Sequence, residues 1–131
     1  MNKKFGAQTV ETIPGYRIVK SGAEGSTNVE EVEWLIATIL STASMWKGLN
    51  WGYLVDISHM SPVSNEVSEV LVTLHKKLAE AGCKAMAFVD RGSFITAAQA
   101  QQHSKKSQTG IEEKHFRSEE EATKWIEEKL G

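Results

Sequence analysis

The sequence predicts an α/β domain built around a parallel β-sheet, and three features of one stretch carry this prediction. An apolar run rich in β-branched and aromatic residues predicts a strand over residues 51–57, and a second apolar run predicts another over residues 83–89. Between them, apolar residues recur at the spacing of an amphipathic helix: Val67, Val70, Leu71, Leu74 and Leu78. Gly82 can adopt the left-handed backbone conformation that often ends a helix. Because a helical crossover returns the chain in the same direction, the two strands are predicted to be parallel neighbours.

Length, composition and charge fit one soluble domain and argue against several classes of protein. The chain has 131 residues, of which 40% are apolar and 24% are charged, which is typical of a globular domain with one core. A net charge of −2 argues against a nucleic-acid-binding protein, which usually has a basic face. No apolar run approaches the roughly 20 residues of a membrane-spanning helix. Since the start lacks a signal-peptide pattern and Cys83 is the single cysteine, we expect one cytoplasmic domain over residues 1–131.

An antiparallel hairpin is predicted before the first helix. Residues 1–5 are expected to be a loose start. Residues 7–13 and 16–23 read as strands joined by the turn signal Pro14-Gly15. The second strand is expected to direct three side chains inward: Tyr16, Ile18 and Val19.

The first helix is predicted over residues 29–46. Asn28 is a good N-cap, with Glu31 three residues later, and Lys47-Gly48 ends the helix. A wide apolar face suits packing on a sheet: Val32, Leu35, Ile36, Ile39, Leu40 and Ala43. Trp34 falls beside this stripe.

The last third of the chain predicts a helix, an edge strand and a closing helix. Ser93 can cap a polar helix over residues 94–106, whose thin inward face is expected to hold Phe94, Ile95, Ala98 and Gln102. Residues 111–116 predict a charged edge strand. Ser118 and Glu121 form a capping box for the last helix. The expected buried face of that helix holds Ala122, Trp125, Ile126 and Leu130.

Two stretches resemble a known family. The strand that ends in Asp56-x-Ser58, followed by a turn and a helix, is similar to a segment of STAS domains (sporulation anti-anti-sigma factor domains). The segment HFRSEEEATKWIEEKL resembles the closing motif of SpoIIAA-like proteins, small stand-alone bacterial relatives of STAS domains. This match is carried by Phe116, Glu120, Glu121, Ala122, Trp125 and Ile126. The resemblance covers residues 7–130 and implies a SpoIIAA-like (STAS-related) fold, with a mixed sheet of four or five strands and about four helices.

The sequence departs from this family at the position of its regulatory phosphorylation. Phospho-regulated STAS proteins carry an acceptor Ser or Thr at the start of the helix, in the motif Asp-Ser-Ser-Gly. The matching residue here is Asn65, and Glu66 follows where a second hydroxyl would lie. We therefore expect no phosphoacceptor, because a phosphate would meet the charge of Glu66, although a helix N-terminus favours anions. A shift in register leaves Ser64 or Ser61 as a weak alternative, and the plain interpretation of Ser64 is an N-cap.

The turns that follow the two parallel strands form the candidate site. In open α/β sheets, ligands bind beyond the carboxyl ends of the strands, and neighbouring strands place their end turns side by side. The candidate ligand- or partner-binding residues are Asp56, Ser58, His59, Ser64, Asn65, Asp90 and Arg91. The alternative interpretation is that these residues form ordinary polar turns.

The sequence gives little support for catalysis or metal binding. Asp56, Ser58 and His59 are too close in sequence for a catalytic triad, which is assembled from distant residues. Three histidines are interpreted as surface residues: His75, His103 and His115. Cys83 is interpreted as a small buried hydrophobe. No spacing of ligand residues suits a metal and no glycine-rich phosphate loop follows a strand, so we expect no catalytic residue, metal or cofactor.

Four tryptophans are many for a chain of this length. Trp46 and Trp51 should meet near Leu49, where the first helix approaches the next strand, and Trp34 and Trp125 lie on helices. Core packing is the default interpretation, whereas an exposed aromatic patch would mark a partner or an apolar ligand.

The favoured function is a non-enzymatic binding or regulatory module that acts through the strand-end turns, with a protein partner or a small apolar ligand. Two alternatives stay open. The first is a carrier of a small apolar or lipid-like ligand, since the fold resembles lipid-binding CRAL-TRIO domains; an enclosed cavity on the order of 300 Å³ or more would favour it. The second is a hydrolase-type enzyme that uses Asp56 or Asp90, which two carboxyls with raised pKa values in one cleft would favour. A homodimer is possible, and neither a nucleic-acid partner nor a membrane span is expected.

Overall fold

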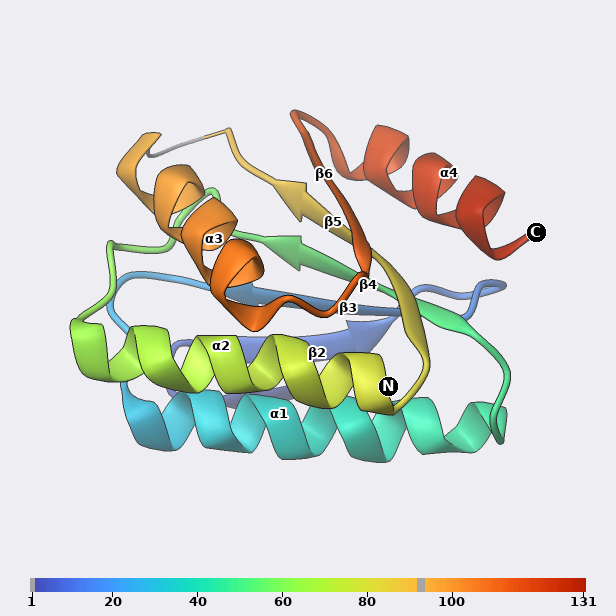
Figure 1. Cartoon of the computed structure of the whole chain (residues 1–131), viewed down its shortest axis with the longest axis horizontal. Coiled ribbons are helices and arrows are strands. Elements are labelled where there is room, and N and C mark those ends of the chain that lie inside the picture. The colour runs from blue at the N-terminus through green and yellow to red at the C-terminus, as the bar shows by residue number, and fades with distance from the viewer. Residues whose placement is uncertain (1, 92–93) are drawn as a thin grey trace.

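A six-stranded mixed sheet with helices on both faces forms the structure, a computed structural model that describes residues 2–91 and 94–131 (Figure 1). The strands are β1 (Asn2–Phe5), β2 (Gln8–Thr12), β3 (Ile18–Ala23), β4 (Trp51–Asp56), β5 (Cys83–Val89) and β6 (Glu112–Phe116). The helices are α1 (Val29–Ala43), α2 (Asn65–Glu80), α3 (Phe94–Ser107) and α4 (Glu119–Leu130). Strands follow one another across the sheet in chain order. The α/β class is therefore confirmed.

Strand directions divide the sheet into two parts. The β1–β2 and β2–β3 pairs are antiparallel, whereas β3 to β6 run parallel to one another. The predicted hairpin and the predicted parallel pair of β4 and β5 are both confirmed. Helical crossovers explain the parallel part, because α1, α2 and α3 each connect two successive strands.

The helices bury two separate cores on opposite faces of the sheet. On one face, α1 and α2 lie side by side, with α3 packed beside α2 (Figure 1). The predicted apolar stripes supply this core, including Val32, Leu35, Ile39, Leu74 and Leu78. On the other face, α4 covers β4 and β5 with Ala122 and Ile126. Gly52 permits this approach, because a Cβ there would lie 2.2 Å from Cγ2 of Ile126.

Three of the helices begin at the N-cap residues that the sequence predicts. The Asn28 side chain accepts a hydrogen bond from the backbone N–H of Glu31 at 2.9 Å. Ser64 and Ser118 cap α2 and α4 in the same way, each at 3.2 Å. Each bond satisfies an N–H group that has no partner within its own helix.

Residues 2–5 are not a loose start, and the sheet has six strands rather than the four or five predicted. Residues 2–5 form β1, an edge strand whose side chains are all exposed, so no alternation of buried residues reveals it in the sequence. Gly6 makes the return to β2 at a φ of 58°. A side chain there would collide with Glu31 of α1, since its Cβ would lie 2.0 Å from Oε2.

Two further predictions about the N-terminal half are wrong in detail. Helix α1 ends at Ala43, and a single 3-10 turn (Ser44–Trp46) follows it. Tyr16 is exposed, because the hairpin connection is longer than the Pro14-Gly15 turn and leaves this residue outside β3. Ile18 and Val19 are fully buried as predicted.

Helix α3 has its buried face on the opposite side from the predicted one. Ile95, Ala98 and Gln102 are exposed. The buried residues are Thr96, Ala100, His103 and Ser107. This face makes polar contacts with α2 and with the segment before it, so apolar periodicity does not identify it. The predicted cap Ser93 and the side chain of Phe94 lie outside the described residues.

The tryptophans differ in burial. Trp51 is buried, its ring meets Trp46, and its indole N–H donates to the carbonyl of Ala81 at 2.9 Å. Trp34 is partly buried, against Phe5. Trp125 lies against Phe116 and packs on the core beneath α4 as predicted, but it is only partly buried. Leu49 is exposed beside the Trp46–Trp51 pair.

Candidate functional site

Two turns from neighbouring strands meet at the carboxyl edge of the parallel sheet, as predicted. The Asp56 carboxylate accepts the backbone N–H of Ser58 at 2.9 Å and lies 3.5 Å from the Arg91 guanidinium. The Ser58 hydroxyl donates to the carbonyl of Val89 at 3.3 Å and accepts the N–H of Arg91 at 3.1 Å. These bonds cross from the turn after β4 to the turn after β5. We call Asp56, Ser58, Asp90 and Arg91 the turn cluster.

Asp90 extends the turn cluster towards β6. Its carboxylate is hydrogen-bonded to Nδ1 of His115, and its backbone N–H donates to the carbonyl of Phe116 at 3.0 Å. The His115 ring stacks on Phe88 with centroids 4.8 Å apart. His115 is therefore partly buried rather than a free surface residue.

The other candidate residues lie along the connection from β4 to α2. His59 is exposed, and its carbonyl accepts the N–H of Gly25 at 2.8 Å. It borders a polar surface depression together with Lys4, Lys20 and Asp56. Ser64 and Asn65 lie at the start of α2, where the Ser64 hydroxyl accepts the Val67 N–H.

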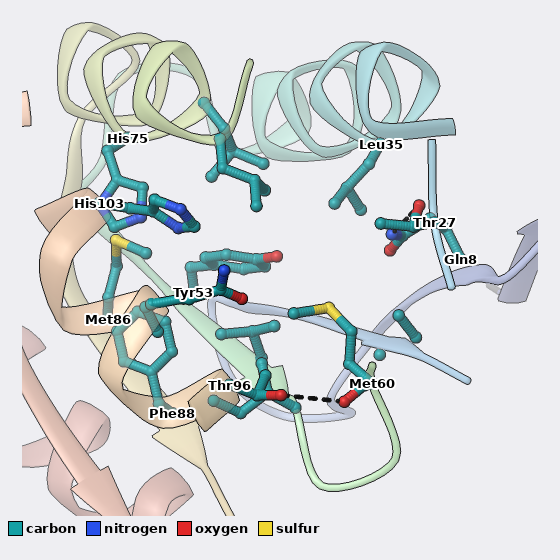
Figure 2. Close-up of a pocket in the computed structure, with 18 residues that line it drawn as sticks. Gln8, Thr27, Leu35, Tyr53, Met60, His75, Met86, Phe88, Thr96 and His103 are labelled. Atoms are coloured by element: carbon teal, nitrogen blue, oxygen red, sulfur yellow. Dashed lines mark hydrogen bonds between the residues drawn. The ribbon is translucent and has the colours of Figure 1, made fainter. Parts of the chain in front are cut away.

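A small cavity, which we call the chamber, lies between the sheet and the helices near the turn cluster (Figure 2). Tyr53, Val55, Met86 and Phe88 form its floor on β4 and β5. Its roof is formed by Leu35, Leu71 and Leu74, and one end by His75. Another wall comes from Met60 and from Thr96, Gln99, Ala100 and His103 of α3. Its volume of about 50 Å³ is far below the size expected for a carrier of lipid-like molecules.

Two histidines that were predicted to be at the surface are buried at the chamber. His75 and His103 are only 3% and 4% exposed. The prediction fails because His75 lies four residues after Leu71 and three before Leu78, at the margin of the buried stripe. Burial, helped by the charge of His103, lowers the pKa of His75 to about 4. Burial and the neighbouring Lys106 likewise lower the pKa of His103 to about 4.

A polar cluster joins α2, α3 and β6 behind the chamber. His103 is 3.0 Å from the Ser68 hydroxyl of α2, and Ser104 of α3 is hydrogen-bonded to Glu113 of β6. Burial raises the pKa of Glu113 above its ordinary value, against the effect of Ser104 and His115. His75 Nδ1 lies 3.9 Å from Glu113 Oε1.

No pattern in the sequence groups these residues into a site. His75, His103 and Glu113 come from three elements that lie far apart in the chain. One signal existed for α3, because Thr96, Ala100, His103 and Ser107 follow the i, i+4, i+7, i+11 spacing of one helix face. That face carries a single apolar residue, so a search for apolar stripes overlooks it.

The geometry of the carboxylates favours structural roles. One carboxylate oxygen of Asp56 accepts the Ser58 N–H, and the other lies near the Arg91 guanidinium. The Asp90 carboxylate is hydrogen-bonded to His115. Within residues 2–91 and 94–131, no group of three or more His, Cys, Asp or Glu side chains is placed to hold a metal ion. No helix of the same residues has the length and apolar character needed to cross a membrane. Cys83 is buried as predicted, and burial raises the pKa of its thiol to about 12.

Sequence comparisons find no family model and no curated protein that matches this chain. Solved structures do match it over nearly its whole length. An uncharacterised DUF3478-family protein from Shewanella loihica PV-4, described as having a SpoIIAA-like fold, is 18% identical with a TM-score of 0.71, covering 96% of this chain and 98% of its own. An anti-sigma factor antagonist from Mycobacterium paratuberculosis is 11% identical with a TM-score of 0.59, covering 92% and 94%.

A third match is the anti-sigma factor antagonist SpoIIAA in its unphosphorylated form. It is 17% identical, with a TM-score of 0.62, and the alignment covers 93% of this chain and 97% of SpoIIAA. Such low identities establish shared architecture rather than shared activity. The chain therefore has a SpoIIAA-like, STAS-related fold.

Proposed function

We propose that this protein is a non-enzymatic regulatory module that binds a protein partner through the turn cluster and the adjoining start of α3. The observation that carries the proposal is the hydrogen-bonded connection from Asp56 through Ser58 to Arg91. It fixes two turns from different strands into one surface. Structures of the same fold that are described as anti-sigma factor antagonists support a regulatory role.

The chemistry of this surface suits a protein partner. The Arg91 side chain is 54% exposed, although its guanidinium is oriented by Asp56. Ile95, in the first turn of α3, is 59% exposed. An oriented arginine and an exposed aliphatic side chain four residues further along the chain are residue types that protein-binding surfaces commonly use. We expect the partner to present a carboxylate next to an apolar side chain.

Regulation of this surface by phosphorylation at the start of α2 is not expected. Asn65 stands where phospho-regulated relatives carry a hydroxyl, and the Ser64 hydroxyl already caps the helix. Phosphopeptide mapping of protein purified from its own host tests this expectation. Stoichiometric phosphate on Ser61 or Ser64, together with loss of partner binding in Ser64→Asp, would contradict it.

Site-specific photocrosslinking in the host tests the proposed surface. A photoreactive amino acid at position 91 should capture the partner, whereas the same group at Lys84 should not. Lys84 is an exposed residue at the opposite end of β5, so it is a matched control. In protein without a photoreactive group, Ser58→Ala should weaken binding of the partner, because this substitution removes the hydroxyl that joins the two turns. Equal capture from positions 91 and 84, or full binding by Ser58→Ala, would contradict the proposal.

The alternative function, a carrier of a lipid-like ligand, has weaker support. The chamber lies on the expected face of the sheet, but its volume of about 50 Å³ has no room for an acyl chain.

A further inference from the structure

Helix α3 has its polar and apolar sides reversed. Its buried side is mostly polar and consists of Thr96, Ala100, His103 and Ser107. On its exposed side, Ile95 is 59% exposed and Ala98 is exposed as well. A helix that only covered a sheet would direct its aliphatic side chains inward. The reversal therefore leaves the aliphatic side chains of α3 available to another molecule.

The exposed side of α3 is one continuous stripe. Ile95, Ala98, Gln102 and Lys105 follow the alternating spacing of three and four residues that places side chains on one helix face, and all are exposed. The same residues border a shallow surface depression. At a rise of 1.5 Å per residue, the stripe is about 15 Å long, or about three turns. Arg91 of the turn cluster precedes Ile95 by four residues in the chain, so the stripe continues the partner surface described above.

This part of the chain is basic, although the protein as a whole is slightly acidic. From Arg91 to Ile111 there is no Asp or Glu, and the charged residues are Arg91, Lys105 and Lys106. The two lysines are exposed in the last turn of α3, where they suit the helix dipole. The same dipole favours acidic residues in the first turn, which α1, α2 and α4 have and α3 lacks. The stripe thus has an uncharged middle and cations towards its ends.

We propose, on the basis of the partner surface described above, that the protein partner docks an acidic amphipathic helix along this stripe. The apolar side chains of such a helix would cover Ile95 and Ala98, and the small side chain of Ala98 lets the two helices approach closely. Its carboxylates would lie against Arg91 at one end and Lys105 at the other. Complementary charges at both ends would fix the direction and register of the docked helix.

The composition of the stripe suits a protein helix better than a polyanion. A nucleic-acid site places several cations along successive phosphates, whereas here the cations are separated by uncharged residues. A lipid surface is bound through a broad apolar face flanked by cations, and Ile95 is the single large aliphatic side chain of the stripe. Ile95 and Ala98 have a use only where the occupant has apolar side chains of its own.

Site-specific photocrosslinking at Gln102 in the host tests the docking, with mass spectrometry used to map the segment of the partner that is captured. This segment should have apolar residues at helical spacing and more Asp and Glu than Lys and Arg. Lys124, exposed on α4, is the control position and should not capture the partner. Capture from position 91 but not from 102 would overturn the docked helix and leave the proposed function standing. No capture from either position would overturn both.

The sequence of the segment captured at position 102 decides the chemistry of the occupant. A segment that lacks helical apolar spacing, or that carries more Lys and Arg than Asp and Glu, would overturn the proposal. Equal capture of the partner from positions 102 and 124 would also overturn it, because the contact would then not be specific to α3.

NMR titration of the full chain with designed peptides tests the same surface without the natural partner. The probes are two helical peptides of about four turns with one shared stripe of Leu and Ala, flanked by Glu in one peptide and by Lys in the other. The Glu peptide should shift the backbone amide signals of Ile95, Ala98 and Gln102 in a saturable way, and the Lys peptide should not. Absence of saturable shifts in α3, or equal binding of the two peptides, would overturn the proposal.

Charge reversal separates this docking from other uses of a basic surface. Lys105→Glu combined with Lys106→Glu should weaken binding of the Glu peptide at least about tenfold. Lys124→Glu, the same change on exposed α4, should leave binding unchanged. These side chains are all exposed, so the variants should fold as the wild type does. Unchanged peptide binding in the double variant would overturn the proposal, as would binding of phosphatidylglycerol vesicles or single-stranded RNA that the double variant loses.

Discussion

Helices α2 and α3 occupy equivalent places in the fold but are held by different interactions. Each follows a parallel strand and leads to the next one. Helix α2 buries Val67, Leu74 and Leu78 in the main core. Helix α3 buries Thr96, Ala100, His103 and Ser107 and is joined to its surroundings largely by side-chain hydrogen bonds. The contrast indicates that α2 stabilises the fold, whereas α3 closes a chamber and borders a surface turn.

The largest expected effect lies on α2. Leu74→Ala removes a side chain that is only 2% exposed, so the free energy of unfolding should fall by about 2–5 kcal/mol. Urea unfolding measures this change. The control is Lys76→Ala on the exposed side of the same helix, which should alter stability by less than about 0.5 kcal/mol. Similar losses in the two variants would mean that α2 does not pack as described.

The next effect is a loss of stability in acid, which originates between the two helices. Folded His75 and His103 stay neutral down to a pKa of about 4, whereas in the unfolded chain they protonate near their ordinary pKa of 6.5. Between these values the unfolded state binds more protons, so this stability is fully present above pH 6.5 and is lost as the pH falls towards 4. The loss should be roughly 2–3 kcal/mol for each histidine, partly offset by the raised pKa of Glu113.

Urea unfolding at a series of pH values tests this expectation. His75→Phe should show a smaller loss of stability than the wild type between pH 6.5 and 4, because one of the two buried imidazoles is gone. An identical pH dependence in the two proteins would refute the assignment of the effect to His75.

A smaller effect should come from the hydrogen bonds that fasten α3. Gln99→Ala removes both bonds to the backbone of Val63, so stability should fall by about 1 kcal/mol. The amide of Val63 should also exchange faster with solvent. Gln102→Ala, an exposed change on the same helix, is the matched control and should do neither. Unchanged exchange at Val63 in Gln99→Ala would show that the side chain does not hold this segment.

The smallest effect is expected at Ile95. Its side chain is 59% exposed, so Ile95→Ala should change the free energy of unfolding by less than about 0.5 kcal/mol. The same variant should nevertheless weaken partner capture, because the proposed partner surface includes the start of α3, where Ile95 lies. A loss of stability comparable with that of Leu74→Ala would restore the inward orientation that the sequence predicted for this residue.

The two helices also show which part of the structure could be predicted from sequence. Burial of an amphipathic helix on a sheet leaves a periodic apolar stripe, and that stripe predicted the buried side of α2. Neighbouring parallel strands bring their end turns together, and that rule predicted the contact of Asp56 and Ser58 with the turn at Arg91.

The remainder depends on tertiary contacts that leave no periodic signal. Strand β1 pairs by its backbone and exposes every side chain. The face of α3 is buried by partners on α2 and the preceding segment, and polar residues satisfy those partners better than apolar ones. The chamber and the burial of His75 follow from that packing, so neither could be predicted from the residues of α3 alone.

Native-state hydrogen exchange tests the central claim most directly, namely that α2 belongs to the apolar core whereas α3 is held largely by side-chain hydrogen bonds and can open separately. Backbone amides in the second half of α3 and at Val63 should exchange through openings that require at least about 1 kcal/mol less free energy than those of amides in the middle of α2. The α2 amides should exchange only on global unfolding. Equal opening free energies in the two helices would contradict the account, because α3 would then be part of the same cooperative core as α2.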